Sequence, residues 1–120
     1  MFQYAAKVLR IVDGDTLWVN LDLGFRIHLE VDIRLARINA PETVQYNVSG
    51  IVDPAKTYIM ECVPPGSICI VGISKAEKYG RWLAELYFLP GETDRMKILQ
   101  NARVLNDELL TKGLALPYKK

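Results

Sequence analysis

The chain has 120 residues, half of them hydrophobic and 24% charged, with a formal net charge of +1. This length and composition are those of one globular domain, and the near-neutral balance excludes a global basic field that would attract nucleic acid. No apolar run approaches the ~20 residues of a membrane span, and residues 1–4 lack the basic and apolar regions of an export signal. We therefore expect a cytoplasmic protein with no membrane partner.

The first half of the chain is typical of three consecutive strands. Residues 4–12 predict the first strand, Asp13-Gly14 is a hairpin signal, and residues 15–23 alternate as the return strand. Gly24 then predicts a second hairpin, and residues 25–38 a long third strand. In that strand five apolar residues are expected to face the core, with polar residues between them: Ile27, Leu29, Val31, Ile33 and Leu35. Arg34 therefore points away from the core.

The end of the third strand is expected to bend. Leu35 and Ile38 cannot both face inward in a regular strand, so residues 36–38 predict a bulge or bend, a feature that redirects side chains near sites. Pro41 has no N–H to donate and a fixed φ, so it ends the strand and holds Glu42 in a defined turn. Arg34 and Glu42 can then face one small anion together.

The second half of the chain alternates helix and strand signals. A loop over 43–52 precedes a helix that begins with Asp53 as N-cap and Pro54 as its first residue and stops at Pro64-Pro65-Gly66. Strands are expected over 67–74 and 81–89, and residues 90–100 are interpreted as an inserted loop with one helical turn. Asn106 is expected to cap a last helix over 107–112, and Gly113 to follow it as the C′ residue.

This order of elements predicts the fold class. Five strands with a helix between the third and the fourth are the order of a five-stranded OB-fold Greek-key barrel. We therefore expect a mainly β protein with helices (α+β), in which residues 1–120 form a single OB-fold domain with two short helices.

Four short pieces of the chain carry candidate chemistry. Taken alone, each has a simpler reading: Asp13 to Thr16 as a turn, Arg34 as a solvated strand residue, Pro41-Glu42 as a loop and residues 78–81 as a hairpin with a basic edge. Together they supply what phosphodiester hydrolysis needs, which is a hard cation, a group that positions water, and cationic groups for the phosphoryl oxygens. Asp15 offers a metal ligand, Glu42 a partner for water, and Arg34 with Arg81 two bidentate cations.

The order and the amino-acid residues of these pieces resemble the motifs of the staphylococcal nuclease (thermonuclease) family. The similar segments are residues 9–16, 34–43, 78–81 and 113–115, so the resemblance runs from about Lys7 to Tyr118. It implies an OB barrel with flanking helices and a calcium-dependent hydrolase of DNA and RNA that leaves 3′-phosphates.

The resemblance also implies roles for individual residues. One Ca²⁺ would be held by Asp15, Asn39 and the backbone carbonyl of Ala40, and Glu42 would activate or orient the water. Arg34 and Arg81 would stabilise the transition state. By the same resemblance, Lys78 and Tyr79 would lie beside the terminal phosphate of the substrate, and Tyr118 near the nucleotide.

One departure from the family pattern bears on the metal. Asn39 stands where the family usually has a second aspartate, so one negative charge is lost although an amide oxygen can still bind Ca²⁺. We expect weaker metal affinity, with another divalent metal as an alternative. The leading hypothesis is a monomeric metal-dependent nuclease with DNA and/or RNA as substrate. Its rival is a catalytically weakened or inactive module that binds nucleic acid or protein on the same barrel.

Overall fold

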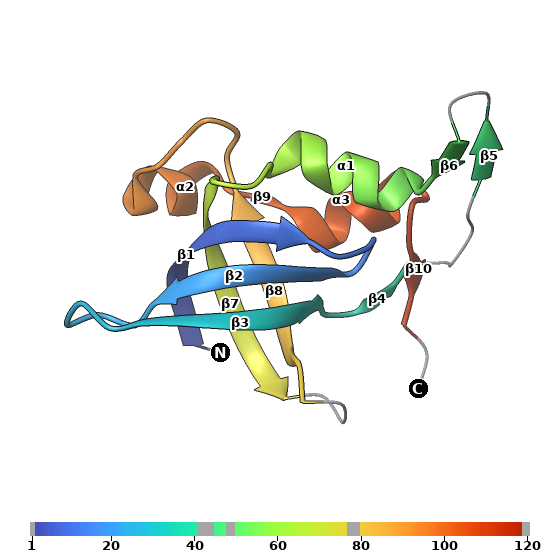
Figure 1. The fold of residues 1–120 in the computed structure, drawn as a ribbon. Helices are drawn as coiled ribbons and strands as arrows, with labels where there is room; N and C mark the ends of the chain where they lie inside the picture. Colours follow the sequence, from blue (N-terminus) through green and yellow to red (C-terminus); the bar gives the residue numbers. More distant parts are fainter. Residues whose placement is uncertain (1, 41–44, 48–49, 77–79, 119–120) are drawn as a thin grey trace.

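The computed structural model describes residues 2–40, 45–47, 50–76 and 80–118. Its centre is a sheet in which β1 (Phe2–Ile11) lies between β2 (Thr16–Asp22) and β7 (Ile68–Ala76), with β3 (His28–Leu35) next to β2 and β8 (Trp82–Phe88) next to β7. These neighbours are antiparallel, and β3 also pairs in parallel with β8, which closes the barrel (Figure 1). The predicted five-stranded barrel is confirmed.

Short strands extend this barrel at its margins. β9 (Arg103–Val104) pairs with β8, and β10 (Leu116–Pro117) pairs with β4 (Ile38–Asn39). β5 (Gln45–Asn47) and β6 (Gly50–Val52) form a separate hairpin, which projects from the barrel beside α1. The pairing of β10 with β4 brings the last described residues back to the end of β3.

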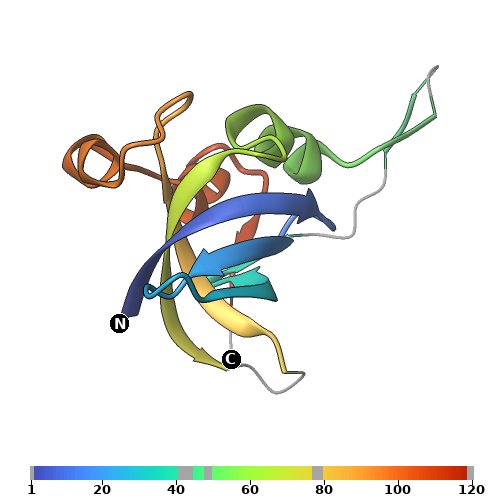
Figure 2. The ribbon, with the colours of Figure 1, turned by 60° about the vertical axis from the view of Figure 1, so that its left-hand side comes forward.

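Three helices accompany the barrel: α1 (Pro54–Cys62), α2 (Arg95–Asn101) and α3 (Leu105–Thr111). α1 and α3 contact each other along the top of the barrel, whereas α2 packs against β7 and β8 (Figure 2). Within the described part of the chain, no helix has the length and apolar character needed to cross a membrane.

The start of α1 follows the sequence prediction. The Asp53 side chain accepts a hydrogen bond from the backbone N–H of Lys56 at 3.1 Å, and Pro54 occupies the first helical turn. At the other end of the chain, Gly113 adopts φ +71° after α3, as the predicted C′ residue requires.

Two expectations about the later helices were wrong. A helix of seven residues, α2, stands where a loop with a single turn was expected, because Asp94 caps the N–H groups of Met96 and Lys97 and Ile98 is buried. The fold therefore has three short helices and not two. Asn106 does not cap α3, because this helix already begins at Leu105. Asn106 is a residue of the helix itself, and it is fully buried.

The third strand also differs from its expected form. The break over 36–38 is confirmed, since Arg37 adopts φ 69° between β3 and β4. However, β3 begins only at His28, and Ile27 and Leu29 are exposed instead of lying in the core. Their hairpin reaches past the end of the barrel, where no opposing strand covers them among the described residues.

Candidate functional site

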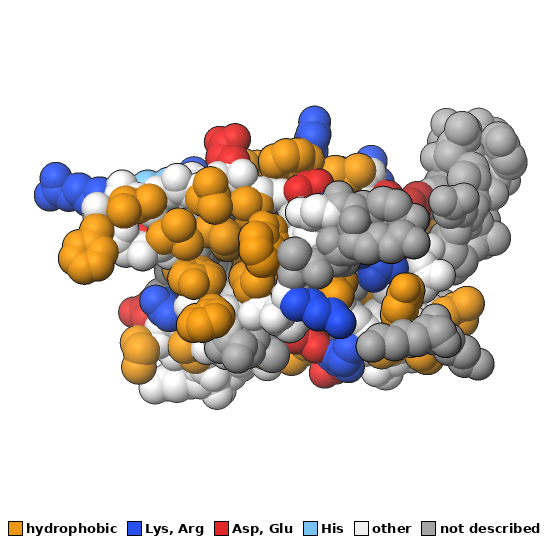
Figure 3. Space-filling model, turned by 90° about the horizontal axis from the view of Figure 1, so that it is seen from below, with side chains coloured by type: hydrophobic (Ala, Val, Ile, Leu, Met, Phe, Trp, Pro, Cys, Tyr) orange, Lys and Arg blue, Asp and Glu red, His pale blue; other side chains and the backbone are white. Residues whose placement is uncertain are grey.

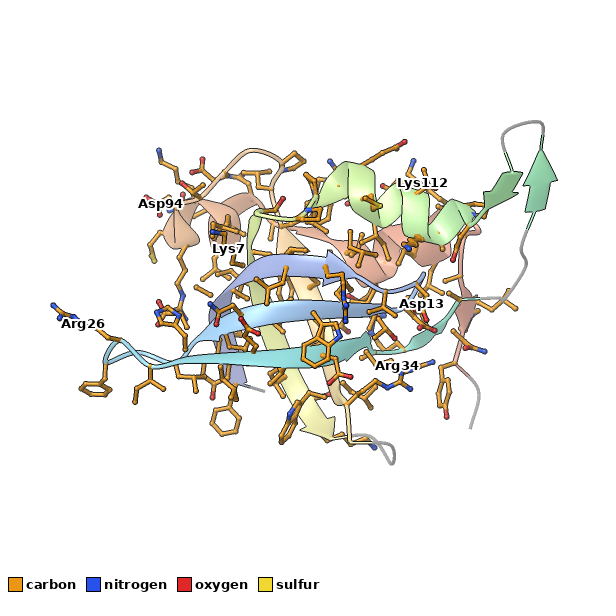
Figure 4. All side chains as sticks on the ribbon, viewed as in Figure 1. Lys7, Asp13, Arg26, Arg34, Asp94 and Lys112 are labelled. Carbon is orange, nitrogen blue, oxygen red and sulfur yellow. The ribbon has the colours of Figure 1, made fainter. Side chains whose placement is uncertain are left out.

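The candidate site lies at one end of the barrel, where the turn before β2 meets the end of β3. Thr16 pairs directly with Arg34 across the two strands, and the backbone N–H of Leu35 donates to the carbonyl of Asp15 at 2.8 Å. Figure 4 labels Arg34 and Asp13 at this end of the barrel. The strand register therefore sets the distance between the predicted metal ligand and the first arginine.

The Asp15 carboxylate is the centre of this site. Its Oδ2 lies 3.7 Å from Arg34 Nη2 and accepts a hydrogen bond from the Ala40 N–H at 3.3 Å, while Oδ1 accepts from the Thr16 hydroxyl at 3.1 Å. The Asp15 and Arg34 side chains are only 14% and 11% exposed. Burial, together with the neighbouring Asp13 carboxyl, raises the pKa of Asp15, against the opposing effects of the Ala40 N–H and Arg34. The surroundings therefore disfavour the ionised form of this carboxylate, with Arg34 as its cationic neighbour.

Arg34 links three segments that are distant in the sequence. Its Nη2 donates to the Asn39 side-chain oxygen at 3.4 Å, and its guanidinium lies 5.1 Å from the centre of the Tyr118 ring. Tyr118 is positioned by its own N–H, which donates to the Arg37 carbonyl at 2.9 Å, and by the adjacent β10–β4 pairing. The structure thus places Tyr118 beside Arg34.

The second arginine reaches the same carboxylate through a hydroxyl. Arg81 Nη1 donates to Thr16 Oγ1 at 3.1 Å, and that hydroxyl in turn donates to Asp15. Thr16 is buried, and sequence reasoning did not single it out as a site residue. The signal that could have found it is its place opposite Arg34 at the first position of the return strand.

The donor atoms fit a hard cation. The side-chain oxygens of Asp15 and Asn39 both lie near Arg34 Nη2, so they face a common region next to the backbone of Ala40. A carboxylate and an amide oxygen are ligands that Ca²⁺ accepts. In the part of the chain described by the structure, no group of three or more His, Cys, Asp or Glu is placed to hold a metal, so any site here has few charged ligands.

A glycine sets how closely the Asp15 turn approaches the rest of the site. A Cβ on Gly14 would lie 2.6 Å from the Ala55 Cβ at the start of α1 and 2.8 Å from the Ala40 Cβ. Only a residue without a side chain allows this contact, which holds Asp15 next to Ala40.

The structure brings most of the predicted site residues together. These are Asp15, Arg34, Asn39, Ala40, Arg81 and Tyr118. The predicted residues Glu42, Lys78 and Tyr79 lie outside the described residues.

A comparison with protein families places this site in context. Residues 32–120, most of the chain, match the family model described as staphylococcal nuclease homologue. The matched range includes Arg34, Asn39 and Arg81, and Asp15 precedes it. A search of curated proteins finds no match to the chain.

Proposed function

The chain belongs to the staphylococcal nuclease homologue family, and from this premise we propose that it is a metal-dependent nuclease that hydrolyses phosphodiester bonds of DNA and/or RNA and leaves 3′-phosphate products. One observation carries the proposal: two arginines converge on a single, largely buried carboxylate, Arg34 directly and Arg81 through Thr16. Structural ion pairs of this kind need one cation, whereas a phosphoryl transition state needs several positive groups.

In this proposal, Ca²⁺ is the cofactor and is held by Asp15, by the Asn39 amide oxygen and by the Ala40 carbonyl. When bound, the ion neutralises charge on a phosphate oxygen. Asp15 suits the role because its carboxylate is largely buried and, like the Asn39 side-chain oxygen, lies near Arg34 Nη2.

The two arginines have the main role in binding the reacting phosphate. With a metal at Asp15, Arg34 and Arg81 direct their planar N–H donors to the phosphoryl oxygens, which match them bidentately. Tyr118 stacks on Arg34 and limits its orientation. Glu42 orients the attacking water, and Lys78 and Tyr79 contact a terminal phosphate. The roles of these last three residues rest on the sequence.

The first experiment is cleavage of end-labelled single-stranded DNA with Ca²⁺ or with EDTA. We expect metal-dependent cleavage that falls by about 10²-fold or more in Glu42→Gln, since the loss of a group that handles the proton of water has an effect of this size. Glu61→Gln, at an exposed position of α1, is the matched control and should cleave normally.

A specific feature supports the alternative function, a binding module without catalysis. Asn39 removes one charge from the metal site, and a net charge of +1 gives no general attraction for a nucleic acid. A folded protein that binds the oligonucleotide but does not cleave it with Ca²⁺, Mn²⁺ or Mg²⁺ would establish this alternative and refute the nuclease.

The role of residue 39 has a test of its own. Asn39→Asp should tighten Ca²⁺ binding in calorimetry and lower the calcium concentration needed for half-maximal cleavage, because it adds a second charged ligand. Asn101→Asp, at the end of α2, controls for the added charge. Equal calcium dependence in the wild type and Asn39→Asp would exclude residue 39 from the metal site.

A further inference from the structure

The hairpin that joins β2 to β3 exposes a run of large apolar side chains. Leu23, Phe25, Ile27 and Leu29 are all exposed, Phe25 to 98% and Leu29 to 48%. Seen from below, apolar side chains gather along this side of the molecule (Figure 3). Single exposed apolar residues are ordinary, but a contiguous set on one hairpin marks an interaction surface.

The same hairpin presents an unpaired backbone edge. β3 pairs with β2 from His28 to Arg34, but its pairing with β8 on the other side begins only at Ile33. Among the described strands, none pairs with that side of β3 before Ile33. An unpaired edge with exposed apolar side chains is a template for another strand.

Two hydrogen bonds identify the backbone groups on this edge. The Leu35 N–H donates towards β2, to the Asp15 carbonyl, and the Ala36 N–H donates towards β8, to the Ala84 carbonyl. Because the direction alternates along a strand, the N–H and C=O groups of His28 and Glu30 point away from β2, on the side that β8 reaches only at Ile33. They are available to a strand added from outside.

We propose that this edge binds a second copy of the chain, as an antiparallel β3–β3 pair whose two-fold axis passes between the two Leu29 residues. In this register His28 of each copy lies opposite Glu30 of the other. The two Leu29 side chains meet at the centre, where the exposed apolar residues of both hairpins add to the contact. The arrangement is isologous, as expected of a C₂ dimer.

Charge selects this register over its neighbours. A two-fold axis at Glu30 would set the two Glu30 carboxylates opposite each other, and like charges directly opposite are destabilising. An axis at His28 would set Asp32 opposite Gly24 in the turn and shorten the paired segment. The Leu29 register sets Glu30 of each copy opposite the His28 imidazole of the other. This proposed dimer differs from the monomer expected from the sequence.

The test begins with the mass of the full chain, measured by sedimentation equilibrium over a series of micromolar concentrations. We expect the wild type to approach the dimer mass, and Leu29→Lys to remain a monomer because it places two ammonium groups opposite each other. Met96→Lys, which changes an exposed apolar residue on α2, should dimerise like the wild type. Since both positions are exposed, unchanged thermal unfolding will show that the variants are folded.

A cysteine variant tests the register. A non-hydrogen-bonded pair brings Cα atoms to about 4.5 Å, within reach of a disulfide, so Leu29→Cys should oxidise to a covalent dimer. Ile27→Cys should not, because the two Ile27 positions lie about 13 Å apart in this register. The native Cys62 and Cys69 are buried and do not interfere. A monomeric wild type, a dimeric Leu29→Lys, failure of Leu29→Cys to cross-link or cross-linking through Ile27→Cys would each overturn the proposal.

Discussion

Of the buried polar residues that the structure describes, Asn106 is the one whose loss has the largest predictable cost. Its Nδ2 donates to the Ala36 carbonyl at 2.9 Å and to the Ala84 carbonyl at 3.0 Å, and its Oδ1 accepts from the Leu86 N–H at 3.0 Å. It therefore joins α3 to β8 and to the bend that follows Arg34. The Ala84 carbonyl keeps a second donor, the Ala36 N–H, if the side chain is removed.

Asn106→Ala leaves two buried backbone groups without these partners, the Leu86 N–H and the Ala36 C=O. At about 1–3 kcal/mol each, the variant should lose about 2–6 kcal/mol of unfolding free energy. This is a large part of the ~5–15 kcal/mol of a typical domain and corresponds to a fall in Tm of about 8–24 °C.

Urea and thermal denaturation measure this loss. Asn101→Ala, at the exposed end of α2, is the control and should change stability by less than about 0.5 kcal/mol. Asn106→Asp keeps an acceptor for Leu86 but turns an oxygen towards two carbonyls, so it should be at least as harmful as alanine. A loss below about 1 kcal/mol in Asn106→Ala would refute the reasoning.

Three further changes test the site and its support. Gly14→Ala brings a Cβ to within 2.6 Å of the Ala55 Cβ, so it should cost about 1–3 kcal/mol and weaken Ca²⁺ binding; unchanged values for both would contradict the close packing. Burial raises the pKa of Asp15, so the folded state favours the protonated carboxyl, and this contribution to the free energy of unfolding is lost as pH rises through that pKa. Metal-free Asp15→Asn should therefore exceed the wild type in Tm at pH 7, with the difference vanishing near pH ~3. Arg103 lowers the pKa of Glu108, so the wild type should exceed Glu108→Gln in free energy of unfolding by about 1 kcal/mol at pH 7. This difference should disappear as pH falls below ~4, and a difference that persists there would have another origin.

Local signals predicted much of the fold because their causes are local. Asp53 followed by Pro54 begins a helix, and Gly113 ends one, since each effect depends on a few neighbouring backbone groups. Asp94, which caps α2, was instead counted with Gly91 and Thr93 as a loop residue, and α2 was therefore underestimated.

Residues that act through distant partners were predicted less well. Asparagine is a residue type that often caps helices, but the hydrogen-bond partners of Asn106 are 70 and 22 residues away, and nothing local reveals them. Thr16 likewise gains its place in the site from Arg81, 65 residues later in the chain. A side chain of either kind can be assigned only when the strands that it joins have been placed.

The sequence by itself determined which residue types this protein brings to its site, the order of its strands and the bend after Arg34. These features follow from alternation, caps and motifs, which depend only on neighbouring residues. Only the tertiary structure decided which element packs against each face of a strand. Alternation assigned Leu29 to the same face as Ile33, yet Ile33 is fully buried inside the barrel and Leu29 lies beyond its end. The physical reason is that burial depends on the opposing element, and the reach of a hairpin past its neighbours follows from the register of the whole sheet.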